Sequence, residues 1–175
     1  MRQATIMLAM LFTGASTGAL AAQGPSRMPP GWAVGGSVQR VSLFEWATPV
    51  VTLRATKLPE RGVGADFAFS VFPAGLEYGA LMVMSDIGVV APARLSNATV
   101  FARAGASALA LVGQGGGGGA LNAYVGAGTI LQIAPSIGLR FDVERRFVPG
   151  VNPRYGFFVV GMGITSIPRG RKRDG

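Results

Sequence analysis

The sequence predicts an all-β protein, an eight-stranded, antiparallel, up-and-down transmembrane β-barrel preceded by a cleaved signal peptide. Apolar and polar residues alternate with a period of two in eight segments, and turn-forming residues separate these segments. Because a β-strand sends successive side chains to opposite faces, each segment has one apolar and one polar face. The polar faces carry charges of both signs, whereas the apolar faces are nearly free of charge.

The N-terminus has the three parts of a secretory signal peptide. Arg2 supplies a positive start, residues 6–12 are apolar, and residues 19–21 form an Ala-x-Ala cleavage site, so we expect cleavage after Ala21 (signal peptide, residues 1–21). A membrane anchor is the alternative, but the apolar run is too short to span a bilayer comfortably. Residues 22–30 are polar and Pro-rich and predict a flexible lead-in. No later stretch is apolar enough to predict a transmembrane helix.

The barrel is predicted to cover residues 31–167. Its strands are expected at about Gly31–Ser42, Pro49–Lys57, Val63–Phe72, Tyr78–Val90, Asn97–Val112, Leu121–Gln132, Ile137–Phe147 and Tyr155–Ile167. This leaves about 17 residues for each strand with its connection, and a membrane strand needs about 9–11. The fifth segment is rich in alanine, so a helix is the alternative there. Ile130 is the one apolar residue that breaks the polar set of the sixth segment.

The polar faces of the strands carry the residues that we expect inside the barrel. This charge set has four bases and four acids: Arg54, Asp66, Asp86, Arg103, Arg140, Asp142, Glu144 and Arg146. A basic side chain facing lipid costs about 2–4 kcal/mol at the bilayer midplane, which favours the inward placement. We expect opposite charges to pair and to plug the narrow lumen that eight strands enclose. A polar conduit or a binding site for a small solute is the alternative.

Two stretches carry a resemblance to a known family: "NAYVGAGTILQIAPSIGLRFDVERRF" and the closing segment "YGFFVVGMGITS". Their pattern resembles the outer-membrane β-barrel family that includes the transmembrane domain of OmpA and OmpX. The resemblance covers about Gly31–Ile167. It implies an outer membrane of Gram-negative type, outer-membrane lipid and lipopolysaccharide as partners, insertion by the barrel-assembly machinery, and a monomer. The chain departs from the family because it continues past Ile167 into a basic tail (residues 168–175) instead of ending on an aromatic residue.

An even number of strands places both termini on one side, which the resemblance implies is the periplasm. Periplasmic turns are expected at Lys57–Gly62, Ala91–Ser96 and Ile133–Ser136. Short outer loops are expected at Leu43–Thr48, Pro73–Glu77, Gly113–Gly119 and Val148–Arg154.

Composition argues against catalysis. The chain has no Cys and no His, which removes thiol chemistry, the usual general base and the commonest metal ligand. Asp142 and Glu144 share one face about 7 Å apart by strand rise, but Arg140 and Arg146 flank them and favour ion pairs over a raised pKa. The run Gly115–Gly119 lacks the following Lys-Ser/Thr of a phosphate-binding loop. We therefore expect no enzyme, no cofactor and no metal.

The net charge of +8 points to a basic tail and loops, since no nucleic-acid-binding motif accompanies it. We expect no nucleic-acid partner. The function predicted is structural or surface-interactive, with a lumen plugged by paired charges. A narrow porin-like channel for small solutes is one alternative. A soluble exported β-barrel that binds a small apolar ligand is the other, although such a barrel would have to invert the two faces.

Overall fold

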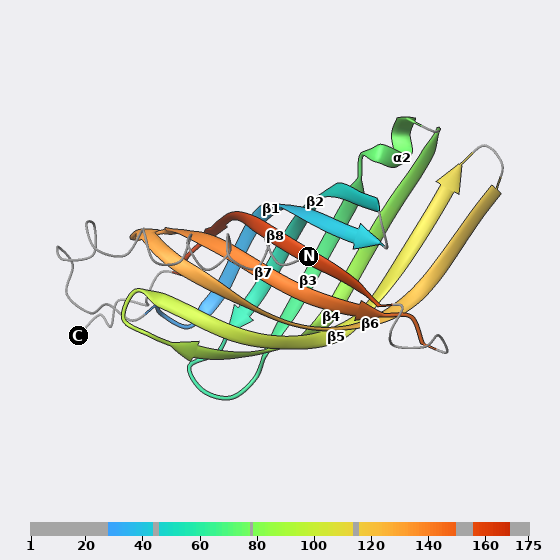
Figure 1. Cartoon of the computed structure of the whole chain (residues 1–175). Helices are drawn as coiled ribbons and strands as arrows, with labels where there is room; N and C mark the ends of the chain where they lie inside the picture. Colours follow the sequence, from blue (N-terminus) through green and yellow to red (C-terminus); the bar gives the residue numbers. More distant parts are fainter. Residues whose placement is uncertain (1–27, 44–45, 78, 114–115, 150–155, 169–175) are drawn as a thin grey trace, which may run out of the picture.

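The computed structural model describes residues 28–43, 46–77, 79–113, 116–149 and 156–168. The strands are β1 (Gly31–Leu43), β2 (Trp46–Leu58), β3 (Gly64–Phe72), β4 (Ala80–Arg94), β5 (Ala98–Gly113), β6 (Gly116–Ala134), β7 (Ile137–Phe147) and β8 (Phe157–Ser166), with one short helix, α2 (Ala74–Glu77). Each strand pairs antiparallel with the next, and β8 pairs with β1 to close the barrel (Figure 1). The predicted eight-stranded up-and-down barrel is confirmed. The predicted signal peptide and its cleavage site at Ala21 lie outside the described residues.

Closure matters because backbone N–H and C=O groups must pair with each other wherever lipid replaces water. A barrel pairs every strand on both sides and leaves no edge in the hydrocarbon region. In the described part of the chain no helix has the length and apolar character needed to cross a membrane.

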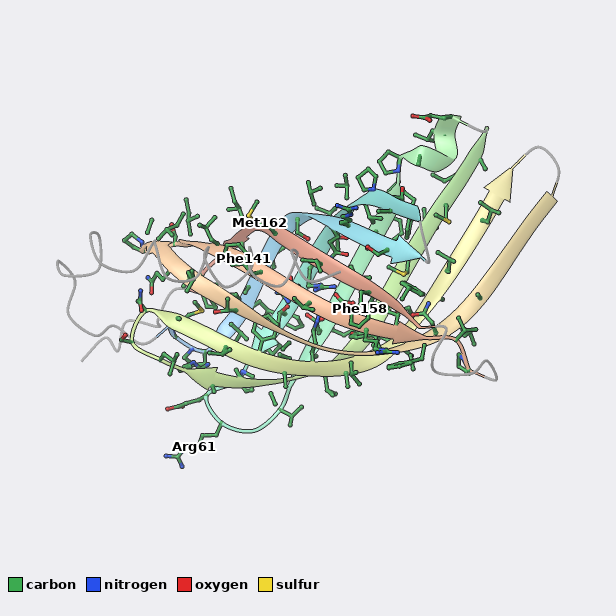
Figure 2. All side chains as sticks on the ribbon, in the orientation of Figure 1. Arg61, Phe141, Phe158 and Met162 are labelled. Carbon is green, nitrogen blue, oxygen red and sulfur yellow. The ribbon has the colours of Figure 1, made fainter. Side chains whose placement is uncertain are left out.

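The two faces of the strands separate as the alternation predicts. On β2, Leu53 is 64% exposed while its neighbour Thr52 is 0% exposed. The same alternation runs round the barrel and leaves large apolar side chains outside, among them Val34, Leu53, Phe69, Ile87, Leu121 and Met162. In Figure 2 most of the side chains on the outside of the barrel are drawn in carbon green, with Phe141, Phe158 and Met162 labelled. The exterior is therefore an apolar belt, which suits lipid and does not suit a water-soluble barrel.

The alternative of a helix in the Ala-rich fifth segment is wrong. That segment is strand β5, paired with β4 and β6 along its length. Helix propensity is overridden because both backbone edges are bonded to neighbouring strands. The small Ala side chains, such as Ala102 and Ala106, point to the exterior.

The ends of the barrel differ. We call the end where β1 begins and β8 finishes the turn end; it also holds the connections 59–63, 95–97 and 135–136. The opposite end, which holds α2, is the loop end. At the loop end β4, β5 and β6 extend beyond the other strands (Figure 1).

Several predicted connections proved to be regular structure. Most of the predicted loop Gly113–Gly119 is strand, because Gly113 pairs with Gly116 and the β5–β6 ladder continues past the rim. Gly116 makes this tight hairpin possible with a φ of 121°, which favours glycine. The predicted loop Pro73–Glu77 contains α2. The end of Val148–Arg154 lies outside the described residues.

Strands β2 and β4 also extend into predicted connections. The predicted turn Ala91–Ser96 is strand as far as Arg94, whose guanidinium donates to the backbone oxygens of Glu60 (3.0 Å) and Leu58 (3.3 Å) and so ties β4 to the β2–β3 turn. Strand β2 begins before Pro49, within the predicted loop Leu43–Thr48, because Thr48 and Ala47 continue the pairing with β1.

Candidate functional site

The interior of the barrel holds all eight residues of the predicted charge set. Each is 5% exposed or less. Arg54 lies on β2, Asp66 on β3, Asp86 on β4 and Arg103 on β5. The other four occupy alternate positions on β7: Arg140, Asp142, Glu144 and Arg146. The structure thus brings together, in one interior cluster, residues that are up to 92 positions apart in the sequence.

Glycines beside β7 make room for its four charged side chains. On the β6 side, Gly126 is the partner of Glu144 and Gly128 is the partner of Asp142. On the β8 side, Gly161 is the partner of Asp142, and Gly163 is the partner of Arg140. Because these glycines have no side chains, the long side chains of β7 can reach across the lumen to β2, β3, β4 and β5. This is one reason why a narrow barrel can contain eight charged residues.

Arg54 lies at the centre of the cluster. Its guanidinium nitrogens are 3.8 Å from Asp66, 3.6 Å from Asp86, 3.3 Å from Asp142 and 3.2 Å from Glu144. Arg54 therefore contacts every acid of the set. Four positive and four negative side chains give the cluster no formal net charge, so each charge is compensated at short range in a region of low dielectric.

The other three arginines share the same acids. Arg146 Nη2 is 2.6 Å from Asp86 Oδ2 and 2.6 Å from Glu144 Oε2. Arg103 Nη1 is 3.0 Å from Asp66 Oδ2, and Arg103 also pairs with Glu144. Arg140 Nε is 2.8 Å from Asp142 Oδ2.

Hydroxyl groups complete the network. Thr56 Oγ1 donates to Asp66 Oδ1 at 2.5 Å and accepts from Arg140 Nη1 at 2.7 Å. Ser107 Oγ accepts from Arg146 Nη1 at 2.6 Å. These bonds join β2, β3, β5 and β7, so the network links strands that are not neighbours in the sheet.

Aromatic rings pack against the arginines. The Tyr124 ring lies between two guanidinium groups, 5.6 Å from Arg103 and 5.1 Å from Arg146. Gly88 and Gly105 make space for this ring: a Cβ built on Gly105 would lie 2.8 Å from Tyr124 Cζ, and one on Gly88 would clash with the Tyr124 hydroxyl. The guanidinium of Arg140 lies 4.8 Å from the Phe101 ring centre. Such cation–π contacts strengthen when they are desolvated.

Apolar layers, which the alternation of side chains alone does not predict, cover the charged cluster at both ends. The turn-end layer consists of Met28, Ala33, Leu58, Val90, Phe101, Ile130 and Ile167. The loop-end layer consists of Val41, Val50, Phe72, Met84 and Val159. Ile130, which broke the polar alternation, belongs to the turn-end layer. The sequence does carry a signal for these layers, namely apolar residues at inward-facing positions near the ends of the strands.

Met28 extends the turn-end layer beyond the strands. This residue belongs to the predicted lead-in (residues 22–30), yet it is 2% exposed, and Thr99 Oγ1 lies 3.6 Å from its Sδ atom. At least this residue of the lead-in is therefore packed inside the barrel mouth.

The interior offers little chemistry beyond charge pairing. Asp142 and Glu144 each contact more than one arginine, so both acids are engaged in ion pairs. The space beside Arg54 and Arg140 has no room for a water molecule. Among the described residues no group of acids is arranged to hold a metal ion.

Comparison with known proteins finds the fold but no sequence relative. No protein-family model matches the sequence, and no curated protein matches it. The N-terminal β-barrel domain of OprF from Pseudomonas aeruginosa has a TM-score of 0.57 at 10% identity, over 82% of this chain and 98% of that chain. Ail, the attachment invasion locus protein of Yersinia pestis, has a TM-score of 0.55 at 13% identity, over 79% of this chain and 99% of that chain. A de novo designed transmembrane β-barrel has a TM-score of 0.57 at 14% identity, over 79% of this chain and 95% of that chain.

These neighbours are small membrane β-barrels, so the fold implied by the sequence resemblance is confirmed. The apolar belt adds an independent physical argument. A closed barrel with an apolar exterior and a charged interior is the arrangement of a β-barrel that spans an outer membrane. Together, the fold and the belt place this protein in an outer membrane, and they exclude the soluble-barrel alternative.

Proposed function

We propose that this outer-membrane β-barrel is a closed, non-catalytic protein that acts through its structure or its outer surface and does not conduct solutes. One observation carries the proposal: the neutral charge cluster fills the middle of the lumen between two apolar layers. An ion that crossed the barrel would have to pass both apolar layers and separate buried ion pairs. Breaking a buried pair costs about 3–5 kcal/mol, so transport requires a rearrangement of the interior.

The loop end supports a role in surface contact. Strands β5 and β6 continue as a hairpin past the point where β7 ends, since β6 pairs with β7 only from Ala123 onward. The hairpin raises Leu111 and Val112, both more than 40% exposed, above the rim. One neighbour in fold, Ail, is named for attachment and invasion. A similar role for this chain rests on the shared architecture and the exposed hairpin.

A narrow channel is the second candidate, and a specific observation favours it. Inside the barrel, the side-chain amide of Gln39 and the Oδ1 atom of Asn122 have no hydrogen-bond partner among the described residues. Buried polar atoms are normally satisfied by protein or water. A row of water molecules bound to the Gln39 amide and to Asn122 Oδ1 would give small solutes a polar path beside the charge cluster.

Planar-bilayer recording separates the two candidates. We expect the refolded protein to give no discrete conductance steps in concentrated KCl, because the apolar layers and the ion pairs close the lumen. The double variant Phe72→Ser with Phe101→Ser weakens both apolar layers. It is the matched control that tests whether the recording can detect a lumen that has been opened. Discrete steps from the unmodified protein, in a preparation that migrates as a folded barrel, would contradict the closed lumen and favour the channel.

A further inference from the structure

The sheet that rises above the rim at the loop end has one covered edge and one bare edge. Strand β4 forms the first edge, and α2 lies against its end: a Cβ built on Gly75 would be 2.8 Å from the Ala80 carbonyl oxygen. Strand β6 forms the second edge. Since β7 pairs with β6 only from Ala123 onward, residues 116–122 have β5 on one side and no strand of the described chain on the other (Figure 1). We call this stretch the bare edge.

The pairing of β6 shows which backbone groups face the bare edge. On the β5 side, the Gln132 N–H donates to the Asn97 carbonyl oxygen at 2.9 Å. An antiparallel strand directs the N–H and C=O of alternate residues to opposite sides. Because the β5–β6 register runs without a shift, the even-numbered residues of β6 bond to β5. Gly117, Gly119 and Leu121 therefore direct their N–H and C=O groups to the bare edge.

The bare edge lacks the features that protect edge strands from pairing. Natural edges carry charged side chains, proline or a bulge, or lie under a helix or loop. Residues 109–122, which include the bare edge, contain no charged residue and no proline. Its glycines also leave space beside it, since a Cβ built on Gly118 would meet nothing within 4 Å. The edge is thus open to another extended strand, and it carries no charge that would repel a copy of itself.

We propose that the bare edge of β6 pairs antiparallel with the bare edge of a second copy of this chain. Such a contact is self-complementary, because a two-fold axis presents the same donors and acceptors from both strands. If residues 116–122 pair along their whole length, Gly119 lies opposite itself and Gly118 lies opposite Ala120 of the second copy. This contact departs from the monomer that the family resemblance implies.

The symmetry of the contact sets the orientation of the two barrels. Antiparallel β6 strands run in opposite directions, so the two barrels extend away from each other. Two copies in one membrane carry β6 in the same sense along the membrane normal and cannot pair in this way. The contact therefore joins copies in two facing membranes. Seven residues at about 3.4 Å each, tilted by about 40°, overlap over about 18 Å along the barrel axis.

A single contact of this size is weak. One pair of short strands buries much less than the roughly 1,600 Å² of a standard interface, so binding depends on many copies acting together between two surfaces. The inference rests on the surface-contact role proposed above. It is independent of whether the lumen conducts.

Clustering of phosphatidylcholine vesicles that carry the full-length protein, loop end outward, tests the contact. Light scattering follows the clustering, and the zwitterionic lipid avoids attraction of a basic protein to anionic lipid. We expect vesicles with the unmodified protein to cluster. The double variant Gly118→Lys with Ala120→Lys should cluster about tenfold more slowly, because it places like charges directly opposite each other across the pair. The double variant Gly118→Glu with Ala120→Glu should be equally slow.

Mixing the two double variants provides the rescue. Vesicles with the lysine variant should cluster with vesicles that carry the glutamate variant, because opposite charges then face each other across the strand pair. Leu121→Pro removes a backbone donor directed at the bare edge without adding charge, and it should also slow clustering. The matched control is Leu76→Lys on α2, which adds a basic side chain at the same end of the barrel, where Leu76 is 61% exposed. It should cluster like the unmodified protein. Heat-shifted migration on SDS gels checks that each variant is folded.

Four results would overturn the proposal. The first is no clustering by the unmodified, correctly oriented barrel. The second is equal clustering by the unmodified protein and both double variants, which would show that β6 takes no part. An equal loss in Leu76→Lys would show general charge repulsion, and clustering with protein-free vesicles would show attraction to lipid. None of these results bears on the closed lumen, which the bilayer recording tests separately.

Discussion

Arg146→Ala is expected to lower the free energy of unfolding by about 3–5 kcal/mol, the penalty for leaving buried acids without a partner. Arg146 is 0% exposed and holds Asp86 through two hydrogen bonds of 2.9 Å and 2.6 Å. The only other arginine near Asp86 within the described structure is Arg54, at 3.6 Å. Removing Arg146 also leaves a void against the Tyr124 ring. Urea unfolding of the protein refolded in micelles, followed by tryptophan fluorescence, measures the change.

Two control variants separate charge from volume and position. Arg146→Met keeps most of the volume and removes the charge, so it should remain strongly destabilised if orphaned acids are the cause. Arg40→Ala removes an arginine that has no partner in the described structure, and its effect should stay within about 0.5 kcal/mol. If Arg146→Ala unfolds at the same urea concentration as the unmodified protein, the buried network does not hold the strands together.

Gly105→Ala is expected to lower the free energy of unfolding by about 1–3 kcal/mol, because it adds a methyl group where none fits. A Cβ at this position would lie 2.7 Å from the Cα atom of Gly88 and 2.8 Å from Tyr124 Cζ, and closer still to the Ile87 carbonyl oxygen. Backbone atoms cannot move aside as a flexible side chain can, so β4 and β5 would have to separate locally. The same urea titration measures the effect.

Gly118→Ala is the matched control for this substitution. Gly118 also lies in a strand of the β5–β6 hairpin, but a Cβ there would meet nothing within 4 Å. Its replacement should change stability by less than about 0.5 kcal/mol. Equal effects of the two substitutions would show that general strand propensity, and not the Tyr124 contact, decides the outcome.

The alternation of side chains was enough to predict the fold and the interior charges. A period of two assigns each residue to a face without knowledge of its neighbours, and Arg54, Asp66 and Glu144 were assigned in this way. The apolar exterior required no further information, because a charged side chain that faces lipid near the bilayer midplane is costly. Strand number followed from counting alternating segments.

Other features depend on pairing that the sequence does not reveal. The run Gly113–Gly119 was expected to be an outer loop, yet most of it continues the β5–β6 ladder, because backbone pairing overrides the low strand preference of glycine. The turn-end apolar layer joins Met28 to Ile167, which lie at opposite ends of the described chain. Strand register and barrel closure are set by backbone pairing between strands, which the sequence of a single segment does not reveal.

Migration of the outer-membrane fraction on SDS gels, boiled and unboiled, is the decisive measurement. A closed barrel with paired backbone groups and an apolar belt should be found in that fraction, resist SDS at room temperature, and shift its apparent size after heating. A soluble protein with no heat shift would contradict the barrel. In that case the two strand faces would be assigned the wrong way round, with Arg54 and Asp142 exposed to solvent.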